Sequence, residues 1–200
     1  MTQQQKSFHV NEEEFELFIS EDEIDARVKE IAQSLNNYYR NKKPIFICVL
    51  NGAFIFYADL VRHITVPCEV DFLKLSSYGE DKISSGNVRL VKDLNCDVHG
   101  RHIVIVEDIV DSGASVNFIL EWIGKKNPAS IKVVTLLHKP ESSSIQSPLE
   151  YVGFEIPSRF VIGYGLDYAQ EGRNLPAVYM LRETHPATES RQETVQEKII

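Results

Sequence analysis

Three carboxylates and four small residues stand together directly after an apolar run, and their types indicate a site for a phosphorylated ligand. The acids are Glu107, Asp108 and Asp111. The small residues that follow them are Ser112, Gly113, Ala114 and Ser115. Backbone amides at the start of a helix bind anions, and a glycine lets an anion come close to the chain. The segment therefore predicts a phosphate-binding turn with acids at its flank.

Carboxylates beside a phosphate repel it unless they hold hydroxyl groups or a cation. Ribose hydroxyls and Mg²⁺ both meet this need. We therefore expect a sugar phosphate, with its phosphate in the turn and its ribose hydroxyls on Glu107 and Asp108. A simpler interpretation of the same residues is a set of helix caps. A nucleotide triphosphatase site is excluded, because the sequence has no GxxxxGK[ST] loop.

The elements that must position this segment alternate between strands and helices. Short apolar runs predict strands at 44–50, 68–78, 88–94, 102–107, 131–137, 159–164 and 177–181. Helices are expected at 21–40, 53–63 and 114–126, the first with a capping box of Ser20 and Glu23. This alternation favours an α/β fold with a central, mostly parallel sheet flanked by helices. Ligands bind such sheets at the carboxyl ends of the strands, where the acids and the turn are expected.

Composition and charge narrow the class of protein. The chain has 200 residues, 43% hydrophobic and 25% charged, which is typical of a globular domain rather than a disordered chain. A net charge of −8 argues against a protein that coats nucleic acid or a membrane. Three widely spaced cysteines, Cys48, Cys68 and Cys96, indicate thiols in a reducing compartment. The first residues contain no apolar segment typical of a signal peptide, so we expect a cytoplasmic protein.

The acidic segment also carries a family resemblance. VEDIVDSGAS, at residues 106–115, resembles the phosphoribosyl-pyrophosphate (PRPP) signature of type I phosphoribosyltransferases. Four further segments follow the order of the hypoxanthine-guanine branch of that family. They are Leu50-Asn51-Gly52, Ser77-Tyr78 before a polar loop at 79–87, Leu137-His138-Lys139, and RFVIGYGLDY at 159–168 with Arg173. The last of these is the most specific.

The resemblance implies a fold and a reaction. The fold is one phosphoribosyltransferase domain, with a core at about 21–140, a small hood at about 1–20 and 141–182, and a polar tail at about 183–200. Residues 1–20 would provide a leading strand or arm. The implied reaction transfers 5-phosphoribosyl from PRPP to hypoxanthine, and to guanine, giving IMP or GMP and pyrophosphate in purine salvage. Mg²⁺ is the implied cofactor, and a homodimer or homotetramer is the implied assembly.

The resemblance also implies roles for the matching residues. PRPP would bind to Glu107, Asp108, Asp111 and the turn Ser112, Gly113, Ala114 and Ser115. Pyrophosphate would bind to Asn51, Gly52 and Arg173. The purine would contact Lys139 through its 6-oxo group, Phe160 by stacking, the backbone of Val161, and Asp167. The metal ligands would be Glu107, Asp108 and Asp167, and Asp111 would act as general acid or base. Ser77 and Tyr78 would begin a flexible loop that closes over the site.

Two positions depart from the pattern of the family. Asn51 and Ala114 stand where many members have lysine, which leaves fewer cations around PRPP. Backbone amides at these positions can still bind phosphate. The resemblance further implies a cis peptide bond between Leu50 and Asn51.

Two functions of other classes compete with the enzyme. One is a PRPP-sensing regulator of transcription or RNA, which would need no base-reading groups and would present a basic face. The negative charge and the lack of a helix rich in Lys and Arg count against it. The other is a receiver-like phospho-acceptor protein, but the predicted strand at 44–50 ends without the acceptor aspartate that it needs.

Overall fold

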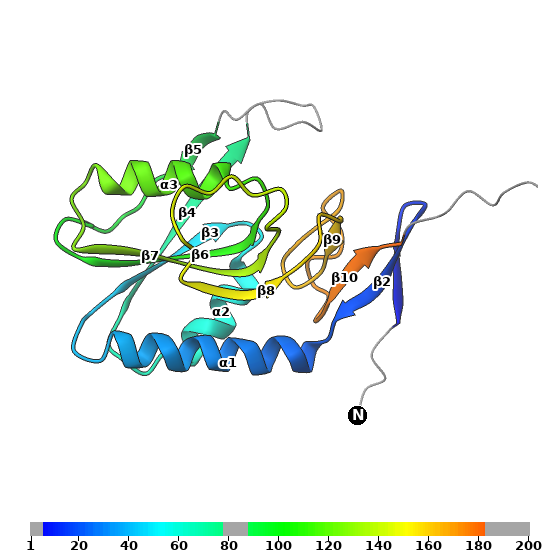
Figure 1. Ribbon diagram of the computed structural model, residues 1–200, viewed down its shortest axis with the longest axis horizontal. Coiled ribbons are helices and arrows are strands. Elements are labelled where there is room, and N and C mark those ends of the chain that lie inside the picture. The colour runs from blue at the N-terminus through cyan, green and yellow to red at the C-terminus, as the bar shows by residue number, and fades with distance from the viewer. Residues whose placement is uncertain (1–5, 78–87, 183–200) are drawn as a thin grey trace, which may run out of the picture.

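The computed structural model describes residues 6–77 and 88–182, and its larger sheet has the strand order β5-β4-β3-β6-β7-β8 (Figure 1). These strands are β3 (Ile45–Leu50), β4 (Glu69–Ser77), β5 (Val88–Lys92), β6 (His102–Val110), β7 (Ser130–His138) and β8 (Tyr151–Glu155). All neighbouring pairs are parallel except β4 with β5, which is antiparallel. The expected mostly parallel sheet is confirmed.

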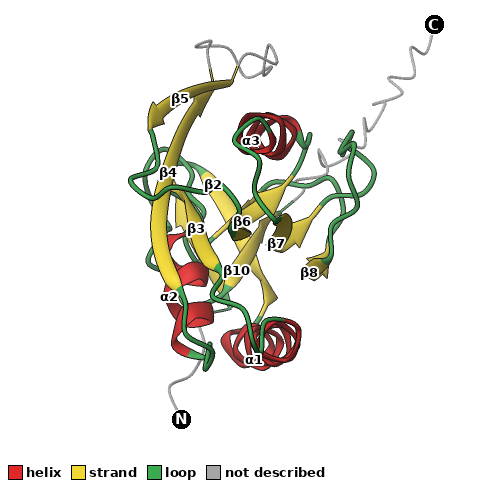
Figure 2. Ribbon diagram, turned by 90° about the vertical axis from the view of Figure 1, so that its left-hand side faces the viewer, coloured by secondary structure: helices red, strands yellow, loops and turns green. Residues whose placement is uncertain are grey.

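Helices cover both faces of this sheet. Figure 2 shows α1 (Glu21–Tyr38) and α2 (Phe54–Arg62) on one face and α3 (Ala114–Gly124) on the other. Along β3, Phe46 and Cys48 belong to the cluster with α1 and α2, whereas Ile45 and Ile47 belong to the cluster with α3. Successive residues of a strand point to opposite faces, so this unbroken apolar run is buried on both sides.

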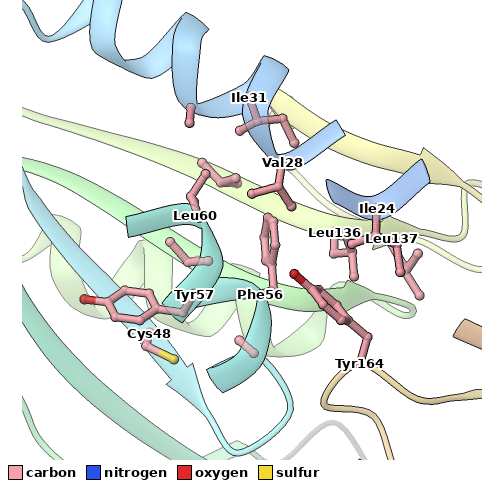
Figure 3. Close-up of a cluster of buried hydrophobic side chains, with 14 of the residues drawn as sticks. Ile24, Val28, Ile31, Cys48, Phe56, Tyr57, Leu60, Leu136, Leu137 and Tyr164 are labelled. Carbon is pink, nitrogen blue, oxygen red and sulfur yellow. The ribbon is translucent and has the colours of Figure 1, made fainter. Parts of the chain in front are cut away.

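The start of α1 agrees with the predicted capping box. The Ser20 hydroxyl accepts from the Glu23 amide at 3.3 Å, and the Ser20 amide donates to the Glu23 carboxylate at 2.9 Å. The helix then buries Ile24, Val28 and Ile31 against α2, as Figure 3 shows. None of the helices in the two described ranges is long and apolar enough to span a membrane.

The N-terminal and C-terminal segments form a second, smaller sheet, which is the expected hood. Its antiparallel order is β1-β2-β10-β9. The strands are β1 (Ser7–Val10), β2 (Glu13–Ile19), β9 (Val161–Ile162) and β10 (Val178–Leu181). The segment expected as a single strand or arm is thus a hairpin. Its second strand pairs with β10, which brings the two ends of the described chain together (Figure 1).

A hydrogen bond fastens the hood to the core beside α2. The Tyr164 hydroxyl donates to Oδ2 of Asp59 at 2.6 Å, although the two residues are 105 positions apart. The Tyr164 ring belongs to the cluster that α1 and α2 form on the sheet, and Figure 3 shows it near Phe56. The segment that follows β9 is therefore anchored to the core by both a polar contact and apolar packing.

Several parts of the fold differ from the expectation. β6 runs to Val110 rather than to residue 107, because it stays paired with β7 as far as His138. β8 was not predicted, and it belongs to the core sheet, so the hood does not begin at residue 141. The strand expected at 159–164 is only two residues long, because the positive φ angles of Gly163 and Tyr164 turn the chain away.

Candidate active site

A cavity of about 380 Å³ opens where the carboxyl ends of β3, β4 and β6 meet the hood. It gathers predicted residues from segments far apart in the sequence. They are Asn51, Gly52, Glu107, Asp108, Asp111, Ser115, Lys139, Phe160, Val161, Asp167 and Arg173. Ser112, Gly113 and Ala114 line a second cavity of about 90 Å³, which shares Glu107, Asp111 and Ser115 with the first. Ser77 ends β4, and Tyr78 and the loop at 79–87 lie outside the described residues.

Glu107 and Asp108, here called the acidic pair, lie inside β6 rather than after it. The side chain of Glu107 is buried, and its Oε2 atom has no hydrogen-bond partner among the described residues. Burial, together with the neighbouring Asp108, raises the pKa of Glu107 well above its ordinary value. Burial also raises the pKa of Asp108 to about 6, although the Ile109 amide and Arg173 favour its charged form. The negative charges of Glu107 and Asp108 are therefore not fully balanced by positive charge from the described residues around them.

This unbalanced pair fits a divalent cation bound together with hydroxyl groups. An orphaned carboxylate oxygen beside a second carboxylate is the type of donor set that Mg²⁺ prefers. No group of three or more His, Cys, Asp and Glu side chains that could hold a metal ion occurs in the described parts of the chain. A cation here would therefore take its other oxygen ligands from a substrate and from water.

The turn after β3 lies against this pair. The peptide bond between Leu50 and Asn51 is cis, as the resemblance implied. A Cβ atom on Gly52 would lie 1.5 Å from Oδ2 of Asp108. A side chain at position 52 would therefore displace the Asp108 carboxylate from its present position.

The phosphate turn has the backbone that its sequence indicates. Gly113 is the N-cap of α3 and has a φ angle of +82°, which favours glycine. The Ser112 hydroxyl accepts from the Ala114 amide at 3.4 Å. The first residues of α3, a helix start of the kind that favours an anion, therefore line the small cavity.

Asp111 and Lys139 form an ion pair with each other. The Nζ atom of Lys139 lies 2.6 Å from Oδ2 of Asp111, and the Ser142 hydroxyl donates to Oδ1 at 2.7 Å. Burial disfavours the charged form of Asp111, but the hydrogen bonds from Lys139 and Ser142 outweigh it and lower its pKa. Lys139 is buried while Asp111 is half exposed. The predicted acid–base group and the predicted purine-reading group are thus in direct contact.

Phe160 presents an exposed ring at the hood side of the cavity. Phe160 is 44% exposed, which is unusual for an aromatic side chain that has apolar neighbours. Its centroid lies 5.5 Å from that of Tyr168 and 6.3 Å from that of Phe15 in β2. These neighbours hold the ring in place while a face remains accessible. Val161, the next residue, is buried in β9 and pairs with Met180.

Asp167 and Arg173 are paired with each other in the hood. The Nη2 atom of Arg173 lies 2.5 Å from Oδ1 of Asp167, and its Nη1 donates to the Gly165 carbonyl at 2.8 Å. The other oxygen of Asp167 accepts from the Gln170 amide at 2.9 Å. Both oxygens of Asp167 therefore have partners, unlike Oε2 of Glu107, and the role of Asp167 as a metal ligand stays a prediction.

The sequence analysis missed cavity residues on β4. Lys74, Leu75 and Ser76 line the cavity directly before Ser77. Lys74 pairs in register with Leu50, so its position beside the turn at Asn51 follows from the parallel pairing of β3 and β4. Pairing with Leu50, the residue before Asn51, is the signal that would have identified Lys74. Lys74 supplies a cation on the side of the cavity where Asn51 lies.

Comparisons with known proteins show the family of this chain. The phosphoribosyl transferase domain matches residues 20–169. The hypoxanthine-guanine phosphoribosyltransferase of Bacillus subtilis is 46% identical over 166 residues, which cover 83% of this chain and 92% of that protein. The hypoxanthine phosphoribosyltransferase of Haemophilus influenzae is 40% identical over 173 residues, covering 85% and 94% of the two chains.

Solved structures agree in the same way. The crystal structure of a hypoxanthine-guanine phosphoribosyltransferase from Bacillus anthracis superposes with a TM-score of 0.79 at 39% identity, over 82% of this chain and 97% of that one. A hypoxanthine phosphoribosyltransferase from Staphylococcus aureus gives a TM-score of 0.80 at 34% identity, over 84% and 91%. The matched domain, these relatives and these structures show that the chain belongs to the phosphoribosyltransferase family, in its hypoxanthine(-guanine) branch.

Proposed function

We propose that this chain is a Mg²⁺-dependent purine salvage enzyme that transfers 5-phosphoribosyl from PRPP to hypoxanthine and to guanine. The products are IMP or GMP and pyrophosphate. The observation that carries the proposal is a single cavity that combines the unbalanced pair Glu107 and Asp108 with Asp111, Lys139 and Phe160. Ribose, pyrophosphate and base each meet suitable chemistry there, and the adjoining small cavity lined by the turn at 112–115 suits the phosphate.

Each part of PRPP has a matching group in this proposal. The 5′-phosphate binds to the amides and hydroxyls of the turn at 112–115, which opens α3. The ribose hydroxyls bind to Glu107 and Asp108. Arg173, Lys74 and the amides near Gly52 lie where they can donate to the pyrophosphate. The transition state resembles an oxocarbenium ion, so these donors act by stabilising the charge on the departing pyrophosphate.

Glu107 and Asp108 are the residues that would hold Mg²⁺. When bound, Mg²⁺ would neutralise part of the charge on the pyrophosphate. Asp167 remains a further candidate ligand, and its two oxygens already accept contacts from Arg173 and from the Gln170 amide.

The purine is recognised by Phe160 and Lys139. The Phe160 ring stacks on the base, and the Lys139 ammonium donates to the 6-oxo group. An amino group at the same position would meet a donor instead of an acceptor, so adenine is disfavoured. Asp111 moves a proton at a purine ring nitrogen, which contributes about 10²- to 10⁴-fold in rate. Lys139 has three protons, so it can contact both the base and Asp111.

The test is product formation from PRPP and Mg²⁺ with hypoxanthine, guanine, xanthine or adenine, together with an EDTA control and the Asp111→Asn variant. We expect turnover of hypoxanthine and guanine, little turnover of adenine, and loss of activity in EDTA and in Asp111→Asn. Binding of PRPP without turnover of any base would favour the PRPP-sensing regulator instead. A homodimer or homotetramer and a cytoplasmic location stay predictions beside this proposal.

A further inference from the structure

The connection between β7 and β8 folds back over the phosphate turn. The amide and the hydroxyl of Ser144 both donate to the Ser112 carbonyl at 3.0 Å. The Asn117 side chain in α3 donates to the Ser144 carbonyl at 3.2 Å and accepts from the Gln146 amide at 3.0 Å. The backbone of this connection is therefore fixed by contacts that do not involve Ser142.

Ser142 uses this fixed position to reach Asp111. Its hydroxyl donates to Oδ1 at 2.7 Å while Lys139 donates to Oδ2 at 2.6 Å, so both oxygens of the carboxylate are held. The Ser142 amide donates to the Lys139 carbonyl at 3.3 Å, which ties the two donors to each other. Asp111 is half exposed, and without the hydroxyl Lys139 would be the one side chain of the described residues that holds its carboxylate.

Other charged groups also face Asp111 around the cavity. Glu107 and Asp108 lie on β6, Lys74 on β4, and the paired Asp167 and Arg173 on the hood. None of these makes a hydrogen bond or ion pair to Asp111 among the contacts of the described residues. The two contacts to Asp111 differ in kind. Lys139 is itself required by the base, whereas the Ser142 hydroxyl has, within the part of the chain that the structure describes, no other partner besides a 3.5 Å approach to the Lys139 carbonyl.

We propose that Ser142 is a positioning residue that fixes the orientation of the Asp111 carboxylate toward the bound purine. The inference rests on the proposed acid–base function of Asp111. When the base arrives and shares the Lys139 ammonium, the Ser142 hydroxyl keeps one carboxylate oxygen in place. The other oxygen is then directed at the base, and the carboxylate stays ionised until it takes a proton.

The experiment compares Ser142→Ala, Ser142→Thr and Ser143→Ala in the full chain. Thr retains the hydroxyl, and Ala retains the backbone contact to Lys139. Ser143→Ala is the matched control, because the neighbouring Ser143 hydroxyl is buried and has no partner among the described residues. The measurements are kcat and KM for hypoxanthine and for PRPP as functions of pH, and the unfolding temperature of each variant.

In Ser142→Ala we expect kcat to fall about tenfold, since one hydrogen bond to a charged group is lost. The KM for PRPP stays unchanged, the acid limb of the pH profile moves to higher pH, and Ser142→Thr restores both features. Wild-type kinetics in Ser142→Ala would overturn the inference, as would a Thr variant as impaired as Ala. Wild-type protein without any transfer activity would instead refute the proposed function, so the two failures are distinguishable.

Discussion

The carbonyl oxygen of Gly52 lies only 2.0 Å from the position that a Cβ atom on Gly165 would occupy. Gly165 has a φ angle of +106°, a conformation that favours glycine. At this point the hood lies directly against the turn that follows β3. Position 165 therefore requires glycine for two independent reasons, its backbone angle and the backbone oxygen that faces it.

Gly165→Ala is expected to lower both stability and activity. The nearest atom is a backbone oxygen, so relief requires the hood segment or the turn at 50–52 to move. We expect a loss of about 2 to 4 kcal/mol in the free energy of unfolding, typical of overpacking combined with a strained φ angle. Urea denaturation measures the first effect, and the KM for PRPP, which should rise as the turn shifts, measures the second.

Gly124→Ala is the matched control for this substitution. Gly124 ends α3, and a Cβ atom there would have no atom within 4 Å. Alanine favours helix over glycine, so this variant should be as stable as the wild type or slightly more stable. Equal stability of the Gly165 and Gly124 variants would mean that the hood adjusts freely at Gly52.

Glu107→Gln is expected to stabilise the chain when no metal or PRPP is present. The change removes a buried carboxylate whose pKa is raised, while keeping its shape. A carboxyl group with a raised pKa costs stability above its unfolded pKa of about 4.3, so the gain is present at pH 7 and vanishes below about pH 4. We expect about 1 kcal/mol at pH 7 in EDTA, measured by urea denaturation.

The same variant should lose the stabilisation that Mg²⁺ and PRPP give together. Ligands that bind only the folded state raise the unfolding temperature, and the wild type should show this rise much more than Glu107→Gln. Glu69→Gln is the control, because Glu69 is paired with Lys43 and Arg101 and its pKa is lowered. A gain in stability from Glu69→Gln as large as that from Glu107→Gln would contradict the argument.

The parts of the fold that follow from short stretches of sequence were predicted well. The capping box at Ser20, the apolar strand at 45–50 and the turn at Gly113 each depend on neighbouring residues. β8 was missed because YVGFE is short, contains a glycine and is only half buried. The order of the hood sheet depends on the pairing of β2 with β10, and nothing local to either strand specifies that pairing.

In the site too, features that a single segment specifies were predicted, and contacts between distant segments were not. The acids and the phosphate turn were predicted because their chemistry is contained in a single segment. The Tyr164–Asp59 hydrogen bond and the pairing of Asp111 with Lys139 join distant segments, and only the folded chain reveals them. Lys74 was missed for a related reason, since its place in the cavity depends on the register between β3 and β4.

Asp71→Asn should destabilise the chain in a pH-dependent way. Asp71 is 4% exposed; burial disfavours its charge, but the amides of Cys96, Phe72 and Asn95 outweigh burial and lower its pKa to about 2. A lowered pKa gives stability that is present above about pH 4 and is lost as the pH falls toward 2. At pH 7 we expect a loss of about 2 kcal/mol.

Urea denaturation of wild type and Asp71→Asn between pH 3 and pH 7 tests this prediction, and the difference between them should shrink as the pH falls. Asp93→Asn is the control, because Asp93 is exposed and its carboxylate accepts from the adjacent Leu94 amide. A difference for Asp71→Asn that does not change with pH would assign its effect to packing rather than to charge.

Phe160→Ala should weaken binding of the base without weakening that of PRPP. The Phe160 ring is 44% exposed beside the cavity, and stacking of a base on an aromatic ring is worth about 1 to 3 kcal/mol. We therefore expect the KM for hypoxanthine to rise about 10- to 100-fold, with the KM for PRPP unchanged. Phe72→Ala is the control, because Phe72 is also partly exposed but packs on Tyr57 and is not among the described residues that line the cavity. If both variants raised the KM for hypoxanthine equally, the effect would come from general loosening, and Phe160 would not be the residue that stacks on the base.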